Sequence, residues 1–326
     1  MADKLNEIDK KIIDRKLVAE IKDIDLKKNY GYYAKIGIVS ETTGFMISRN
    51  NEATELTSED FFDNERVLIP AQKWRAAERS YLLSELRKIG NVIPEGYARN
   101  MNKLKIYLKN PTSLLYGDTS IGSGRDMGSI ASRCFYDWAY SFEPLAEIST
   151  RITHNTLSED GTILHSPEGK TESNAIYNTP YIKPGVKFIR FVTLENSSLE
   201  LLKLEILAIL GTTKYGARTA ILGDNVKNNI IAIGFSKGDK PISSYEVMKQ
   251  AWEESSKEGQ NYNYKPEELI KSFMLSSYGK ENIIIESDLK NLLDDVINLK
   301  KDPNELQNIC KALNDKMEKD WKEFWK

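Results

Sequence analysis

The order of apolar and polar residues predicts three regular elements in the first third of the chain. Residues 33–39 are mostly apolar and β-branched, which is typical of a strand. Pro70 opens a helix that continues to about Ile89, where Gly90 ends it. Residues 103–108 alternate strictly, with apolar residues on one side and two lysines and a tyrosine on the other. This alternation predicts a half-buried strand with a basic, aromatic outer face.

Three further elements follow after a long gap. Residues 186–194 predict a strand. Ser197 and Glu200 have the spacing of a capping box, and the apolar residues after them recur at helical spacing up to about Thr212. In this helix, Lys203 and Glu205 are expected to lie off the apolar face. Residues 229–235 predict a fourth strand.

The predicted order is therefore strand, helix, strand, strand, helix, strand. This order is typical of the ferredoxin-like, split βαβ arrangement, so we predict an α+β fold. The same arrangement underlies the RNA-recognition module, whose open sheet face stacks bases.

Long segments interrupt and extend this core. We expect a core of residues 30–240 that carries a loop at 48–65 and a peripheral region at 117–185, because long loops inside a compact domain tend to be functional. Residues 241–326 predict a helical extension. An apolar stripe along its last helix would pack on its own domain or, alternatively, dock on a neighbouring molecule.

Charge is distributed unevenly along the 326 residues, although the formal net charge is only −2. All 12 arginines lie between Arg15 and Arg218, and residues 66–109 hold 10 basic and 3 acidic residues, a difference of +7. We therefore expect any nucleic-acid surface to be a local patch. The two cysteines, Cys134 and Cys310, exclude a disulfide framework and favour a reducing, cytoplasmic location. No apolar run predicts a signal peptide or a membrane span.

Motifs for catalysis or metal binding are weak. Gly122, Gly124 and Gly128 resemble a phosphate-binding loop, but the spacing does not fit a dinucleotide fold and a flexible surface loop explains them better. His154 and His165 have no partners at metal-ligand spacing. We expect no metal site, no cofactor and no catalytic residue in this chain.

Two short basic segments are candidates for phosphate contact. Residues 214–218, Lys-Tyr-Gly-Ala-Arg, combine two cations, an aromatic ring and a glycine that allows close backbone approach. They could equally complement the dipole of the preceding helix. In the first helix, Arg75 and Arg79 share one face, and a surface ion pair with Glu78 is an equal alternative.

Three motifs in order resemble a known family. They are Asn110-Pro111 followed by Leu115-Tyr116-Gly117, Asn174-Ala175 followed by Pro184-Gly185 and Phe188, and Thr213 with Tyr215-Gly216-Ala217 followed by Gly223. Together they are similar to the backbone subunit of type I-D CRISPR effector complexes, a member of the RNA-recognition-like repeat proteins of CRISPR systems. The resemblance covers roughly residues 30–250.

The resemblance implies a guide-RNA scaffold for antiviral defence. Several copies would line up along one CRISPR RNA, together with a large subunit and a subunit that caps the 5′ end of the guide. A thumb at about 151–183 would interrupt the pairing of guide and target strand at intervals. The candidate RNA-binding residues are Arg49, Lys73, Arg75, Arg79, Arg125, Asn174, Lys214, Tyr215, Gly216 and Arg218.

Two other functions stay open at the level of sequence. Related subunits of type III complexes cut RNA with a loop aspartate, and Asp126 is a loop acid here, so a metal-dependent single-strand nuclease is the alternative. A pure protein-interaction module would rest on the C-terminal apolar stripe.

Overall fold

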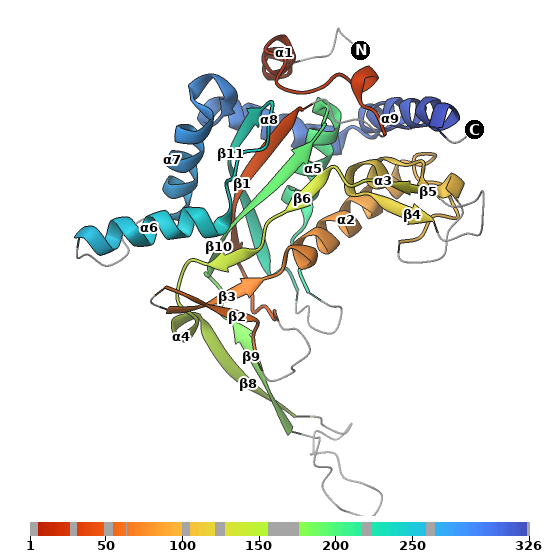
Figure 1. Cartoon of the computed structure of the whole chain (residues 1–326). Helices are drawn as coiled ribbons and strands as arrows, with labels where there is room; N and C mark the ends of the chain where they lie inside the picture. The colour runs from red at the N-terminus through yellow and green to blue at the C-terminus, as the bar shows by residue number, and fades with distance from the viewer. Residues whose placement is uncertain are drawn as a thin grey trace, which may run out of the picture.

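A computed structural model of the chain describes residues 6–26, 31–48, 55–62, 64–99, 105–120, 128–155, 176–216, 223–258 and 265–324. Figure 1 shows a central twisted sheet with helices on both faces and a β-hairpin that projects from one end. None of the helices in this part of the chain has the length and apolar character that a membrane span requires.

The central sheet has the strand order β12-β11-β1-β10-β7-β3-β2, and β6 also pairs with β10. All of these pairs are antiparallel. The strands are β1 Tyr33–Thr42, β2 Ser58–Phe61, β3 Asn64–Ile69, β6 Cys134–Tyr136, β7 Ala139–Ser141, β10 Lys187–Glu195, β11 Val226–Ser236 and β12 Ile283–Ile284. Two short hairpins lie outside it: β4 Asp118–Ser120 with β5 Gly128–Ile130, and β8 Ser149–Asn155 with β9 Ile176–Ile182.

The middle of this sheet is the predicted ferredoxin-like core. Its four strands are β11, β1, β10 and the β6–β7 pair, in that spatial order, and the crossovers pass through α2 Ala71–Lys88 and α5 Leu199–Gly211. The α+β class is therefore confirmed, and so are both core helices. The cap of α5 is one residue later than the capping-box spacing of Ser197 and Glu200 predicted, because it is the Ser198 side chain that accepts a hydrogen bond from the Leu201 amide.

The second core strand is not where the alternation of residues 103–108 placed it. Of that segment, Lys105–Leu108 form a 3₁₀ helix, and residues 103–104 lie outside the described ranges. A 3₁₀ turn has three residues, so it buries Leu108 while Ile106 stays 59% exposed. The strand that fills this place is β6–β7, inside the region expected to be irregular, and it pairs with β10.

The expected loop at 48–65 is also partly wrong. Its end forms the β2–β3 hairpin, which adds two strands to the edge of the sheet through β7. Phe62 takes a left-handed conformation at the hairpin turn, with a φ of 52°. Polar residues hide the edge strand β2 in the sequence, because an edge strand leaves much of its length in contact with solvent.

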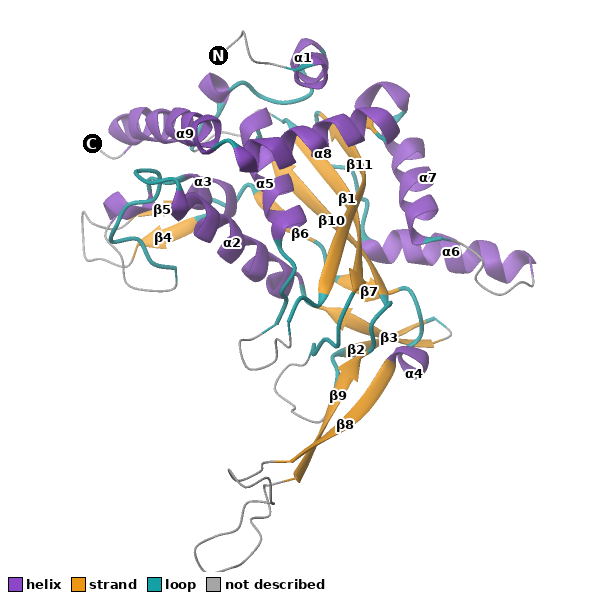
Figure 2. Cartoon of the chain, turned by 180° about the vertical axis from the view of Figure 1, so that it is seen from behind, coloured by secondary structure: helices purple, strands orange, loops and turns teal. Residues whose placement is uncertain are grey.

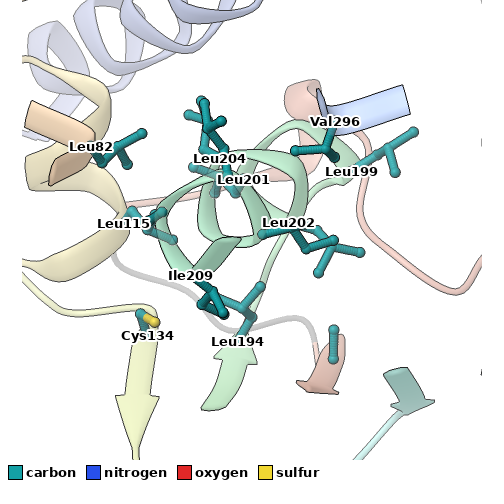
Figure 3. Close-up of a cluster of buried hydrophobic side chains, with 14 of the residues drawn as sticks. Leu82, Leu115, Cys134, Leu194, Leu199, Leu201, Leu202, Leu204, Ile209 and Val296 are labelled. Atoms are coloured by element: carbon teal, nitrogen blue, oxygen red, sulfur yellow. The ribbon is translucent and has the colours of Figure 1, made fainter. Parts of the chain in front are cut away.

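One face of the core packs on α2 and α5, and further helices cover these two (Figure 2). They are α1 Glu7–Asp14, α3 Pro111–Tyr116, α8 Glu286–Lys301 and α9 Pro303–Phe324. Figure 3 shows Leu82 of α2, Leu115 of α3 and Val296 of α8 around the leucines of α5. Because α5 is enclosed on all sides, Lys203 and Glu205 are buried rather than on a solvent face, and Lys203 pairs with Asp9.

The opposite face of the sheet is covered by α6 Ser244–Glu258 and α7 Pro266–Tyr278. The close approach of α7 requires small residues in the sheet. A Cβ atom on Gly37 would lie 2.6 Å from atoms of Ile270 and Met274, and one on Gly234 would lie 2.4 Å from the Tyr278 ring. This face therefore cannot stack bases as the open sheet of an RNA-recognition module does.

The apolar stripe of the C-terminal extension packs on its own chain. Leu306, Cys310, Leu313, Met317 and Trp321 of α9 are all buried in the larger hydrophobic cluster, together with residues of β1 and α5. The Trp321 ring also lies 5.5 Å from the Lys109 ammonium group. The described part of this stripe is therefore not available to dock on a neighbouring molecule.

Candidate nucleic-acid interface

Three loops meet at the end of the sheet from which the β8–β9 hairpin projects. The residues after β1, the residues before β10 and the loop between α5 and β11 are joined by backbone hydrogen bonds. Thr42 donates to Val186 over 2.9 Å, Thr43 to Asn225 over 3.0 Å, and Met46 to Ile182 over 3.1 Å. These hydrogen bonds hold the loops in one arrangement at the base of the hairpin. We call this region the loop end of the sheet.

The α5–β11 loop presents its basic residue to solvent here. The Lys214 side chain is 61% exposed, and its ammonium lies 3.8 Å from the Asp224 carboxylate. Gly216 follows with a φ of 119°, a backbone conformation that disfavours residues with a Cβ atom. Lys214 and Gly216 therefore meet the expectation of an accessible basic loop with room for close approach.

Tyr215 between them has a different role from the stacking one expected. Its side chain is 2% exposed, and its ring packs edge-on against Trp74 with centroids 4.8 Å apart. Its hydroxyl donates to Glu78 Oε1 over 2.6 Å and accepts from Asn228 Nδ2 over 2.8 Å. No base can stack on a ring buried in this way, so Tyr215 anchors the loop instead.

The anchor is part of a buried ion-pair network beneath the loop. Arg190 donates to Glu78 over 2.6 Å, and both side chains are at most 1% exposed. Burial alone would lower the pKa of Arg190, but the facing Glu78 carboxylate together with Tyr215 and Tyr136 raises that pKa above its usual value. The surface ion pair considered for Glu78 with Arg75 and Arg79 is therefore wrong, because Glu78 points into the core.

The basic residues of α2 separate into two groups. Lys73 lies at the loop end, where its ammonium donates to Ser48 Oγ over 3.3 Å and burial lowers its pKa. Arg75 donates to the Tyr116 carbonyl, whereas Arg79 pairs with Asp118 over 2.9 Å. These two arginines attach α3 and β4 to α2, so the structure does not bring them to the loop end.

Comparison with known proteins places this fold in a family. The Csc2 CRISPR family model matches residues 31–310, which is most of the chain. This chain belongs to the Csc2 CRISPR family. The crystal structure of Thermofilum pendens Csc2 is similar over 98% of this chain and 99% of that one, with 16% identity and a TM-score of 0.67. The Csc2 fold is therefore shared despite low identity.

Other comparisons are much weaker. A chain from a structure described as a CRISPR RNA-guided surveillance complex, pre-nicking, covers 76% of this chain with all of its own length, at 9% identity and a TM-score of 0.41. A second surveillance-complex chain gives 11% identity and a TM-score of 0.42. Likeness this low does not establish a common fold. No curated protein is a detectable relative.

The hairpin that projects from this Csc2 fold corresponds to the ends of the segment expected to be a thumb. Strands β8 and β9 pair from Ser149 with Ile182 to Asn155 with Ile176, and they extend away from the body (Figures 1 and 2). The candidate residues Arg49, Arg125, Asn174 and Arg218 lie outside the described residues, as does Asp126.

Sequence reasoning missed one exposed aromatic residue at the loop end. Phe45 is 38% exposed and contacts Tyr181 of β9 edge-on, with ring centroids 5.9 Å apart. The Tyr181 hydroxyl is in turn 2.8 Å from His154 Nε2 on the facing strand. Nothing in the sequence marks Phe45, because its exposure depends on how the loop after β1 is bonded to the hairpin.

The described residues show no arrangement for a metal ion. No group of three or more His, Cys, Asp or Glu side chains among them is placed to hold one. What the loop end offers is an exposed ammonium, a second ammonium at half burial and an exposed ring. This combination suits a flexible polyanion with stacking bases.

Proposed function

We propose that this chain is a backbone subunit that binds CRISPR RNA in a type I-D antiviral effector complex and has no catalytic role of its own. The observation that carries the proposal is membership of the Csc2 CRISPR family across residues 31–310. Copies of the chain line up along one guide, and the other subunits of the complex and the target strand join this assembly.

The loop end of the sheet supports the proposed contact with the guide. Lys214 and Lys73 supply positive charge, Gly216 allows the backbone to approach a phosphate, and the exposed Phe45 ring offers a face to a base. Phosphate contacts of this kind hold any guide, whereas base pairing reads the sequence of the target. The net charge of −2 is compatible with this, because many copies bind one guide.

The β8–β9 hairpin starts directly beside this surface. Its first cross-strand pair, Ser149 with Ile182, lies next to the backbone bonds between Met46 and Ile182. A hairpin in this place would stand between consecutive stretches of guide and so interrupt the pairing of guide and target, which is the role proposed for the thumb.

Binding of a labelled single-stranded RNA of about 40 nucleotides across a salt series tests the proposal. We expect binding that tolerates any sequence and weakens steeply with salt. Lys214→Ala should lower the affinity and reduce the salt slope by about one. Phe45→Leu should lower the affinity by about 1–3 kcal/mol through lost stacking, with little change in the slope.

The control is Lys290→Ala on α8, whose exposed side chain pairs with Asp294 at 2.5 Å far from the loop end. Equal affinities for wild type and for both loop-end variants at every salt concentration would refute this interface. RNA cleavage that disappears with a chelator would instead favour a metal-dependent nuclease.

A further inference from the structure

A cationic cavity lies at the other end of the sheet from the β8–β9 hairpin. The end of α1, the turn after β11 and the end of α7 enclose a space of about 280 Å³, and Figure 1 shows these elements meeting at the end remote from β8 and β9. Four of its lining side chains are the cations Arg15, Lys16, Lys237 and Lys240, and none of the described residues that line it carries a carboxylate. Three hydroxyl groups and one amide complete its polar lining.

The nearest acids compensate little of this charge. Asp239 lies between the two cavity lysines in sequence, but its carboxylate is 3.0 Å from the buried ammonium of Lys35. Glu281 is 3.6 Å from Arg15 and its side chain is 85% exposed, so water screens this pair. When Glu281 and Asp239 are both counted against the four lining cations and Lys35, five cations face two carboxylates and a net charge of +3 remains around the cavity.

One cation, Lys237, and the backbone of another, Lys240, are held by their surroundings. The Lys237 ammonium lies 3.1 Å from the centroid of the Tyr32 ring. The Lys240 carbonyl accepts a hydrogen bond from Lys35, which fixes the turn after β11. An ammonium that is already held in place loses less conformational freedom on binding an anion than a mobile one does.

Lys16 is held in a conformation that a lysine disfavours. It follows the C-cap residue Arg15 at the end of α1 and has a φ of 53°. Its amide donates to Ile13 and the amide of Leu17 donates to Ile12, which is the Schellman arrangement that ends many helices. Glycine is the usual residue there, because a Cβ atom is strained in the left-handed region.

Helix ends explain only part of this arrangement. Arg15 caps the C-terminus of α1 and so complements the helix dipole. Lys237 and Lys240 lie in the turn after a strand, so no helix dipole accounts for their charge. The strain at Lys16 would be relieved by glycine. The convergence of four cations on one cavity therefore points to an anionic ligand.

We propose that this cavity is a phosphoryl-binding site, distinct from the loop end of the sheet, that takes a phosphate ester. Lysine and arginine are the side chains that most often bind phosphate oxygens, and four of them line this space. Since liquid water occupies about 30 Å³ per molecule, the space holds a phosphate or a pyrophosphate group with several waters. The ester is either a residue of a nucleic-acid backbone or a small phosphorylated molecule.

Titration of the whole protein with inorganic phosphate and with pyrophosphate, at constant ionic strength set by sodium chloride, tests the site. Wild type should bind both and gain thermal stability with ligand concentration. Lys237→Ala should weaken this binding about tenfold, as loss of one charge-assisted contact does. Lys290→Ala, which changes a cation outside the cavity, should bind as wild type does.

Lys16→Gly separates a role in binding from a role in folding. If Lys16 served the fold alone, its replacement would change stability and leave ligand binding as it is. Without ligand it should raise the Tm by about 1–3 °C, since glycine relieves the left-handed strain. It should nevertheless weaken pyrophosphate binding by several-fold or more, because it removes a cation from the cavity. Because this variant is expected to be more stable, loss of ligand binding cannot result from misfolding.

RNA binding by the same variants identifies the source of the phosphoryl group. If Lys237→Ala also lowers RNA affinity and reduces the salt slope by about one, the group belongs to a nucleic-acid backbone. If RNA affinity is unchanged while pyrophosphate binding is lost, the ligand is a small phosphate ester. Either result supports the site, and neither depends on the outcome for Lys214→Ala.

The proposal is overturned if wild type shows neither heat of binding nor a Tm increase with phosphate or pyrophosphate and Lys237→Ala binds RNA as wild type does. It is equally overturned if Lys237→Ala and Lys16→Gly both bind pyrophosphate with wild-type affinity.

Discussion

The Tyr136 hydroxyl lies between two buried carboxylates, 2.6 Å from Glu78 Oε2 and 2.6 Å from Glu205 Oε1. A phenol has one hydrogen to donate, so one of these carboxyl groups must itself carry a proton. Glu78 already faces the Arg190 guanidinium, so the proton belongs on Glu205. Burial, followed by the charge of Glu78, raises the pKa of Glu205 to about 7.

This proton predicts a pH-dependent stability. The unfolded chain releases it at the ordinary pKa of a glutamate, whereas the folded chain retains it up to about pH 7. The free energy of unfolding contributed by Glu205 therefore falls as pH rises between these two values and is constant above them. The difference in free energy of unfolding between Glu205→Gln and wild type should therefore shift in favour of the variant by on the order of 2–3 kcal/mol as the pH rises from 5 to 8.

Chemical denaturation of both proteins at several pH values measures this difference. Glu246→Gln, at an exposed position of α6, is the matched control and should follow the wild-type profile. Parallel profiles for wild type and Glu205→Gln would mean that Glu205 carries no extra proton in the folded chain.

At the scale of elements, the contact of α7 with the sheet removes the one surface on which an RNA-recognition module would stack bases. The contact depends on glycines in β1 and β11, which let the helix approach closely. The sequence shows Gly37 inside a strand, where it weakens the strand and marks the close approach of another segment. It does not show which segment approaches.

Gly37→Ala should therefore be destabilising, although alanine has the better strand propensity. Its Cβ atom would be 2.6 Å from side-chain atoms of Ile270 and Met274, so these side chains or α7 itself must shift, at a cost of about 1–3 kcal/mol. Thermal unfolding measures the loss. Gly238→Ala is the matched control, because a Cβ atom there meets no atom within 4 Å. Equal stabilities of the two variants would contradict the close packing of α7 on β1.

At the scale of the whole molecule, the C-terminal helices and the ferredoxin-like core share one hydrophobic cluster. Residues of β1, α5, α8 and α9 all contribute to it, and α6 with α7 forms a second cluster on the opposite face. The described part of the chain thus buries its sheet on both sides by means of residues beyond 241.

A chain that ends at Asp302 should fail to fold. It lacks the buried side chains of α9, each of which contributes about 1.5–3 kcal/mol when fully buried, and their sum approaches the whole stability of a typical domain. Size-exclusion chromatography and circular dichroism would show aggregation or loss of structure. A chain of this length with wild-type Tm would mean that the core is independent of α9.

The sequence by itself determined the two core helices, the helical C-terminal extension, three of the four core strands and the α+β class, because these elements have the periodicity that local burial imposes. Residues 105–108 alternate as a strand does, yet they form a 3₁₀ turn, since alternation cannot say whether a partner strand is available. Lys214 and Gly216 could be expected from composition. The roles of Tyr215, Glu78 and Phe45 could not.

Those roles depend on residues that are distant along the chain. Tyr215 is buried because Glu78 and Asn228, 137 and 13 residues away, meet its hydroxyl, and Phe45 is exposed because the loop after β1 is bonded to β9. The cavity near Lys16 and Lys237 likewise exists only where α1 meets the turn after β11. Local pattern fixes which segments are helix or strand, whereas burial, pairing and the convergence of charge are properties of the packed chain, and tertiary structure alone decides them.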